Sequence, residues 1–147
     1  TSEPAAVLVK ADGARTRLLK APGENEPVIP GATDTVVPIA SVRVVGKPLT
    51  DEYVHRVDRV ADLTGRTVGE PLTAGDVSTV LASEAGGLQD VPAGATAVPL
   101  VNMVDDEGLE ATGHEIAQGV LDRADVPRVV LASMTDPDPV VDVVERP

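Results

Sequence analysis

The sequence predicts an α/β fold, with a mostly parallel sheet flanked by helices, in a single domain that spans residues 1–147. Two observations support this prediction. Short apolar runs rich in valine alternate with stretches whose apolar residues recur at helical spacing, which is typical of parallel strands joined by right-handed crossovers. The chain also has no Phe or Trp and a single Tyr. Val, Leu, Ile and Ala must therefore fill the core, and β-branched side chains suit buried strands.

Five apolar segments are expected to be strands, because each is short, β-branched and bounded by turn residues. Pro38 lies inside the second segment and favours an edge position or a strand end there. The last segment is expected to be an edge strand or a contact for a partner. A long amphipathic helix is expected over residues 107–123. The strand segments are residues 5–11, 35–39, 95–101, 128–132 and 140–144.

Two short helices are expected to form a small insertion beside the sheet, at about residues 49–84. The first is expected to begin at Thr50 as its N-cap, with acidic residues in the first turn, and to stop at Gly65. The second is expected to begin at Thr73, with Asp76 in place of the usual Glu of a capping box.

The chain is strongly acidic, with 24 Asp and Glu against 12 Lys and Arg and a net charge of −12. Such a chain repels nucleic acid, and no basic patch with aromatic residues offsets the repulsion, so a nucleic-acid-binding function is excluded. The scattered acids and the scarcity of Lys favour adaptation to a high-salt cytoplasm, where charge repulsion is screened within about 3 Å at 1 M salt. An acidic surface that recruits a basic partner is the alternative.

The residue types and segments that the sequence lacks exclude several kinds of site and location. The chain has no Cys, which excludes disulfides, thiolate chemistry and Cys-ligated metals. His55 and His114 occupy dissimilar positions, and both are expected to be packed or solvated, with no role in a metal cluster. No run approaches the roughly 20 apolar residues of a membrane span, and no secretory signal opens the chain. The expected location is the cytoplasm.

Polar residues follow three of the predicted strands: Asp12 and Gly13, then Asn102 and Asp105, and finally Ser133. Because the carboxyl ends of parallel strands meet at one edge of a sheet, these groups are expected to converge where ligands bind. Asp12 is the expected metal ligand, holding Mg²⁺ against phosphates. Asn102 and Asp105 are suited to bonding the edge of a purine base, as in guanine-reading NTPases of the P-loop class. The alternative is an ordinary turn with Asx hydrogen bonds.

The loop at residues 13–31 is unusually charged for so constrained a backbone. It carries Arg15, Lys20, Glu24 and Glu26 between Gly and Pro residues, and its prolines forbid a long helix. These features favour a shaped binding loop, and an ordinary charged surface loop is the alternative. Lys20 is the strongest candidate within it, since an isolated Lys in a Pro-bounded loop can reach a phosphate or a substrate carboxylate.

The sequence contains no Gly-x-x-x-x-Gly-Lys-Ser/Thr segment. The phosphate cradle of P-loop enzymes uses backbone N–H groups and a Lys at a helix N-terminus. Without that segment, the residues given cannot carry out P-loop hydrolysis. The chain begins at Thr1 without Met, so the segment either lies upstream or has been lost.

Several segments together resemble the YqeC family, whose members are regarded as accessory proteins of selenium-dependent molybdenum hydroxylases. The most specific segment runs through residues 19–30, Leu-Lys-Ala-Pro-Gly-Glu-Asn-Glu-Pro-Val-Ile-Pro, and the resemblance covers nearly all of the chain. The other matching segments are residues 9–15, 46–49, 54–56, 63–65, 99–105 and 128–131.

Members of that family look like P-loop NTPases with a Gly-rich Lys-Thr loop near the N-terminus. The resemblance therefore implies a P-loop NTPase-like fold that lacks the Walker A segment in this chain. Three positions depart from the family pattern: Lys10 stands where Glu is usual, Asn25 for His and Met103 for Lys. These departures leave metal binding and base specificity open. The positions that keep the pattern are Asp12, Lys20, Glu24, Glu26, Asn102 and Asp105.

The resemblance implies a nucleotide-dependent accessory role in the maturation of selenium-dependent molybdenum hydroxylases. Partners would be such a hydroxylase or the proteins that mature its cofactor, and self-association is left open. Mg²⁺ and a purine nucleotide are expected as cofactors only if a P-loop exists upstream. The main alternative is a non-catalytic scaffold module that keeps the fold, and a further one is a small-molecule transferase that uses no nucleotide.

Overall fold

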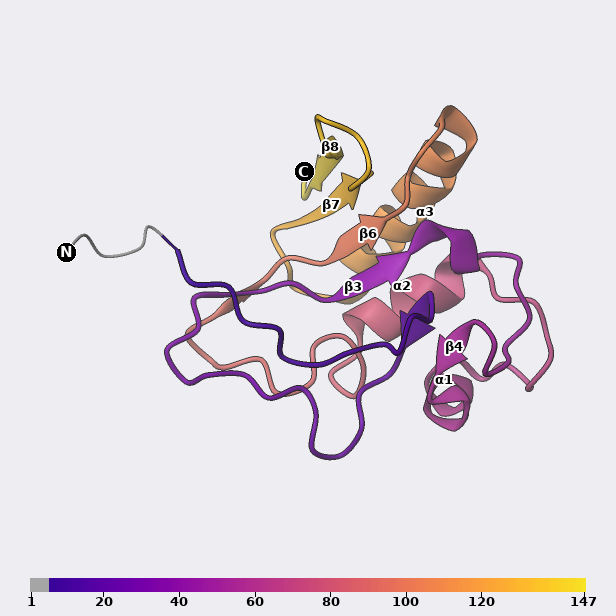
Figure 1. The fold of residues 1–147 in the computed structure, drawn as a ribbon, viewed down its shortest axis with the longest axis horizontal. Helices are drawn as coiled ribbons and strands as arrows, with labels where there is room; N and C mark the ends of the chain where they lie inside the picture. Colours follow the sequence, from indigo (N-terminus) through magenta and orange to yellow (C-terminus); the bar gives the residue numbers. More distant parts are fainter. Residues whose placement is uncertain (1–5) are drawn as a thin grey trace.

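The computed structural model describes residues 6–147 and shows an α/β arrangement built on a small mixed sheet (Figure 1). The central sheet consists of β3 (Ile39–Ser41), β6 (Leu100–Asn102), β7 (Arg128–Ala132) and β8 (Val140–Glu145), side by side in this order. The first three are parallel and β8 is antiparallel to β7. The carboxyl ends of β3, β6 and β7 therefore share one edge.

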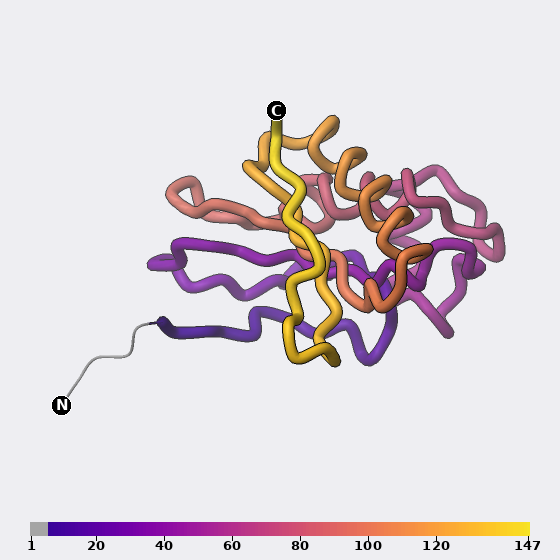
Figure 2. The backbone as a smooth tube through the Cα atoms, turned by 90° about the horizontal axis from the view of Figure 1, so that it is seen from above, coloured from indigo at the N-terminus to yellow at the C-terminus, as the bar shows by residue number. Residues whose placement is uncertain are grey.

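Two strand pairs extend the structure beyond the central sheet. β1 (Leu19–Lys20) pairs in parallel with β4 (Val54–His55), and β2 (Thr35–Val36) pairs in parallel with β5 (Thr96–Ala97). The N–H of Ser41 donates to the carbonyl of Leu18 at 2.9 Å, which joins the first pair to β3. In Figures 1 and 2 the region of β2 and β5 extends to the left, away from α3.

Three α-helices and one short 3₁₀ helix complete the part of the chain that the structure describes: α1 (Val57–Thr64), α2 (Ala74–Ala82), α3 (Glu107–Arg123) and η1 (Val42–Val44). α3 packs on β6, β7 and β8, and α2 lies against α3 and β3. The two helices approach closely at Gly119, where an added Cβ would lie 2.7 Å from Cβ of Ser78. The hydroxyl of Ser78 donates to the carbonyl of Ile116 at 2.8 Å, across the same contact.

The two faces of the central sheet differ. Val129 and Leu131 of β7 are fully buried on the helix side, where Leu131 meets Gly113 of α3. On the opposite face, one apolar residue from each strand lies directly beside its register partner on the next strand, so that the four form a row across the sheet. The two ends of this row are accessible, since Ile39 is 56% exposed and Val143 is 38% exposed. The four residues of the row are Ile39, Leu100, Val130 and Val143.

Several predicted elements are confirmed. The long helix and the strand at 128–132 have the predicted bounds. The strand predicted at 140–144 is β8, an edge strand that ends one residue later. The segments at 35–39 and 95–101 each contain two short strands, because a proline interrupts each run (Pro38 and Pro99). None of the helices in residues 6–147 has the length and apolar character that a membrane span needs.

The strand predicted at residues 5–11 is wrong. Residues 1–5 lie outside the described part, and residues 6–11 form no regular element. Val7, Leu8 and Val9 are 76%, 95% and 58% exposed. An apolar run needs a neighbouring strand and a covered face to become a buried strand, and the described residues provide neither here.

The helix start predicted at Thr50 is also wrong. Residues 50–53 form a turn, Val54 and His55 form β4, and α1 begins at Val57 after Arg56. Pairing of β4 with β1 therefore overrides the helical spacing of the valines. The predicted end is confirmed, because Gly65 caps α1 with φ of 74°.

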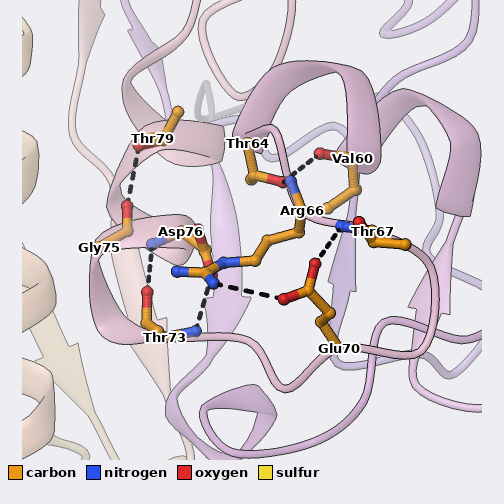
Figure 3. Close-up of polar contacts among 9 residues, drawn as sticks. All are labelled: Val60, Thr64, Arg66, Thr67, Glu70, Thr73, Gly75, Asp76 and Thr79. Atoms are coloured by element: carbon orange, nitrogen blue, oxygen red, sulfur yellow. Dashed lines mark hydrogen bonds and ion pairs between the residues drawn. The ribbon is translucent and has the colours of Figure 1, made fainter.

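A polar network ties the end of α1 to the start of α2 (Figure 3). The predicted capping box is confirmed: the hydroxyl of Thr73 accepts from the N–H of Asp76, and the Asp76 carboxylate accepts from the N–H of Thr73 at 2.8 Å. The same carboxylate accepts from Nε of Arg66 at 2.8 Å, although Asp76 is only 7% exposed. One buried carboxylate thus fixes both the α2 N-terminus and the preceding loop.

We expect Asp76→Ala to lower the free energy of unfolding by about 2–4 kcal/mol, because it removes a helix cap and the buried carboxylate that accepts from Nε of Arg66, which then keeps only its longer contact with Glu70. Thr73→Ala should cost about 1 kcal/mol. Urea unfolding followed by circular dichroism measures both. Thr79→Ala in the same helix is the control and should change stability by less than about 0.5 kcal/mol. Equal effects of the Asp76 and Thr79 changes would contradict the assigned role of the network.

Candidate functional site

The carboxyl edge of the parallel strands carries a polar cluster centred on Asp105. The hydroxyl of Ser133, just after β7, donates to Oδ1 of Asp105 at 2.6 Å. Nη2 of Arg43, in η1 after β3, donates to Oδ2 at 3.0 Å. Three neighbouring strands therefore bring their following residues to one carboxylate, and the structure brings Asp105 and Ser133 together. We call Arg43, Asn102, Asp105 and Ser133 the strand-end cluster.

The turn that leads to Asp105 has an unusual backbone. Met103 has a left-handed φ of 62°, which is rare for a bulky side chain. Its thioether accepts from the hydroxyl of Ser41 at 3.1 Å, and the N–H of Val104 donates to the carbonyl of Ala132 at 2.9 Å. Met103 therefore anchors the turn to β3.

Asn102, at the end of β6, has a buried side-chain oxygen that accepts no hydrogen bond within residues 6–147. A buried acceptor without a donor costs free energy, so such atoms call for an explanation. A ligand that brings an N–H or O–H group to the cluster would satisfy this oxygen.

The electrostatics of the cluster keep Asp105 ionised. The hydrogen bond from Ser133 and then the one from Arg43 lower the pKa of Asp105, and partial desolvation opposes them. An ionised carboxylate only accepts hydrogen bonds. At neutral pH the Asp105 carboxylate therefore offers acceptor oxygens to a ligand, whereas the Asn102 oxygen is buried and would have to be uncovered before a ligand could reach it.

Residues of the charged loop form a second group. The Lys20 ammonium pairs with the Asp12 carboxylate, and both side chains are mostly buried. Gly13 follows Asp12 in the chain, and a Cβ added there would be 3.7 Å from Cε of Lys10. The structure therefore brings Asp12 and Lys20 together. Within residues 6–147 it gives no hydrogen bond or ion pair between the charged loop and the strand-end cluster.

The two glutamates of the loop are held by arginines near α1. Glu26 pairs with Nη2 of Arg56 at 2.6 Å, and Glu24 lies 3.9 Å from Nη2 of Arg59. Nε2 of Gln89 donates to the carbonyl of Gly23 at 2.9 Å, and also to the carbonyl of Glu26. The loop therefore has a defined shape, fixed by side chains from distant parts of the chain.

No three potential metal ligands of the His, Asp or Glu type gather anywhere in residues 6–147. Asp12 offers one carboxylate, and its charge is balanced by Lys20. Mg²⁺ commonly binds through one or two carboxylates together with substrate phosphates. The fit of Asp12 to Mg²⁺ is therefore partial, since phosphates would have to supply most of the other ligands.

Sequence reasoning missed Arg43 and the arginines that bind the loop. Arg43 follows a strand that is predicted in the sequence, so its place at a strand end is a signal that could have identified it. Arg56 gives a weaker signal, because β4 was not predicted. Arg15, a predicted site residue, lies at the mouth of a pocket with Arg56 and has a left-handed φ of 51°.

Comparisons with known proteins point to one family. A family model described as "YqeC: YqeC protein" matches residues 1–58. A protein of Escherichia coli (strain K12) named "Uncharacterized protein YqeC" is 34% identical over 96 residues, which cover 65% of this chain and 38% of that protein. This chain thus spans well under half the length of that relative. No solved structure matches this chain, so the P-loop NTPase-like fold stays a prediction.

We expect Ser133→Ala to raise the pKa of Asp105 toward its ordinary value, because it removes the hydrogen bond that lowers this pKa most. A pH titration of the Asp105 carboxyl carbon by NMR measures the change. A lowered pKa stabilises the folded state at pH values above the ordinary pKa of about 3.9, and this contribution is lost as the pH falls through the folded value. In Ser133→Ala, the free energy of unfolding should therefore fall less as the pH is lowered than it does in the unmodified chain.

The matched control is Ser83→Ala, since Ser83 lies at the end of α2 and contacts only its own loop. Ser83→Ala should leave the midpoint of the Asp105 titration unchanged. An Asp105 midpoint that stays unchanged in Ser133→Ala would show that the hydrogen bond between the two residues does not form in solution.

Proposed function

Because the chain belongs to the YqeC family, we propose that it is the purine-nucleotide-binding part of an accessory protein for the maturation of selenium-dependent molybdenum hydroxylases. The observation that supports nucleotide binding best is the pair of acceptors in the strand-end cluster, the ionised Asp105 and the buried oxygen of Asn102. Both follow β6 at the carboxyl edge of a parallel sheet, where α/β proteins bind ligands.

The chemistry of the cluster favours guanine over adenine. Guanine carries a ring N–H and an exocyclic amino group on adjacent positions, and both are donors, whereas adenine presents an acceptor beside its amino group. An ionised carboxylate can accept from both guanine donors but repels the adenine acceptor. To receive a base, Oδ2 of Asp105 would be shared with Arg43 or released by it, and Arg43 is exposed enough to move.

The charged loop would lie toward the reacting end of the ligand. Asp12 would hold Mg²⁺ together with nucleotide phosphates, and Lys20 would pass from the carboxylate to a phosphate. Glu24 and Glu26 would form a substrate or coupling loop, held in shape by Arg56 and Arg59. No step of the proposal depends on the metal, and the hydroxylase or its maturation proteins remain the proposed partners.

A non-catalytic binding module is the second candidate function, and one observation favours it. The charged groups of the loop are already neutralised within the chain, Asp12 by Lys20 and Glu26 by Arg56. A scaffold that keeps the base site without hydrolysis would have this arrangement. The two candidates differ in whether bound nucleotide is turned over.

We expect the chain to bind GTP more tightly than ATP, in buffer with Mg²⁺ and high salt, when binding is followed by isothermal titration calorimetry. Asp105→Asn should weaken GTP binding by about tenfold or more, because it replaces an ionised acceptor with a group that also donates. Because the residues given lack the phosphate-binding segment, turnover of GTP is measured on the natural protein with any residues that precede Thr1, and there it separates the accessory NTPase from the binding module.

Asp142→Asn is the matched control, since Asp142 is an exposed carboxylate that pairs with His114 at 2.6 Å on β8. It should bind GTP as the unmodified chain does. No saturable signal with millimolar nucleotide, or equal affinity in the Asp105 variant, would contradict the proposed base site.

A further inference from the structure

A pocket of about 460 Å³ lies between β4, the start of α1 and the turn before β1. Its lining includes four arginines, Arg15, Arg17, Arg56 and Arg59, together with His55. We propose that this pocket binds a phosphate group, either free or as the monoester of a small molecule. The proposal goes beyond the nucleotide site and does not rest on it, because none of the lining residues belongs to the strand-end cluster.

The charge of the pocket is opposite to that of the protein. The chain has a net charge of −12 and only 12 Lys and Arg, yet four arginines line this one pocket. Two carboxylates, Asp51 and Asp58, also line it, and Arg56 and Arg59 pair with Glu26 and Glu24, so within residues 6–147 the guanidinium groups of this lining without a carboxylate partner are those of Arg15 and Arg17. A concentration of guanidinium groups in an acidic protein creates a local field that attracts small anions.

The guanidinium groups are available to a ligand. Within residues 6–147, neither Arg15 nor Arg17 has a carboxylate within ion-pair distance. Arg17 instead donates to two backbone oxygens, that of Asp51 at 2.6 Å and that of Arg15 at 3.0 Å. These bonds fix its side chain without neutralising its charge, and a fixed donor loses little freedom when an anion binds.

Arg56 supplies the most direct sign of a missing partner. Its Nη2 donates to Glu26 at 2.6 Å, but its buried Nε has no hydrogen-bond acceptor within residues 6–147. A buried guanidinium N–H without an acceptor is costly. The guanidinium packs against Gly23, so an anion in the pocket would supply the acceptor once the Arg56 side chain turns toward it.

The backbone around the pocket also fits an anion. Arg15 and Arg56 have left-handed φ values of 51° and 66°, and strained residues of this kind are enriched where ligands are held. Val57 and Asp58, the first two residues of α1, line the pocket. Their N–H groups have no partner inside the helix, as is general for the first turn.

His55 reports on the charge of the pocket. Burial, then Arg56 and Arg15, and more weakly Lys20, lower its pKa, whereas Glu26 opposes them. The imidazole is therefore neutral at pH 7. A bound phosphate would reverse the effect of the arginines and raise the pKa of His55, because a nearby negative charge stabilises the protonated ring.

The number and type of donors favour a phosphate over a carboxylate. Arginine forks match the paired oxygens of both groups, but a carboxylate has only two oxygens, enough for one fork, whereas Arg15 and Arg17 both lack a carboxylate partner within residues 6–147. A phosphate has at least three accessible oxygens and close to two negative charges at neutral pH.

NMR of the imidazole protons tests the proposal in the intact chain, because His55 and His114 are the only histidines. Inorganic phosphate, glycerol 3-phosphate and acetate are titrated at constant ionic strength. We expect a saturable shift of His55 and a rise in its pKa with both phosphates at millimolar concentrations, while His114 stays unchanged. Tighter binding of glycerol 3-phosphate would identify a monoester as the ligand, and equal binding would identify the phosphate group alone.

Arg15→Gln should weaken the phosphate response by about tenfold, since it removes one exposed, unpaired guanidinium. Arg128→Gln is the matched control, because Arg128 is exposed on β7 and does not line the pocket. Asp105→Asn should leave the response intact, which separates this site from the proposed base site. An absent His55 response, an equal response to acetate, or full binding by Arg15→Gln would overturn the proposal.

Discussion

The parallel pairing of β6 with β7, packed against α3, is the constraint on which the rest of the structure depends. A core without Phe or Trp gains its burial from many small aliphatic contacts, so its layers must approach closely. Gly113 lets α3 reach Leu131 of β7, and Gly119 lets it reach Ser78 of α2. This close packing holds the two strand ends in register, and the register sets the distance from Ser133 to Asp105.

Opposite charges are distributed unevenly over this framework. The acids are spread along the chain, whereas four arginines gather around the charged loop and the pocket beside it, and the strand-end cluster holds Arg43 alone. The two candidate sites also differ in kind, because one offers acceptors to a base and the other offers donors to an anion.

Hydrophobic spacing and capping residues correctly predicted the helices and strands whose local sequence preference matches their place in the fold. The helix at 107–123 has its own cap and apolar face, and the strand at 128–132 lies inside the sheet. Residues 5–11 have an equally strong strand pattern, but the described part of that run, residues 6–11, pairs with no strand. The helical spacing of the valines hides β4, because its partner β1 is too short to recognise from sequence. Convergence of Asp105 with Ser133 followed from strand ends alone. The contacts of Arg56 and Gln89 depend on how a 19-residue loop folds back, which no local pattern encodes.

The most direct test of the account is a disulfide across β6 and β7 in this cysteine-free chain. Leu100 and Val130 are Cα partners on the less covered face, at the ~4.8 Å spacing of neighbouring strands, which a disulfide can bridge. The account predicts that L100C/V130C closes under mild oxidation and keeps a cooperative unfolding transition. L100C/R128C, two residues out of register and roughly 8 Å apart, should stay reduced. Closure of the second pair in preference to the first would show that the strand ends do not meet at the proposed site.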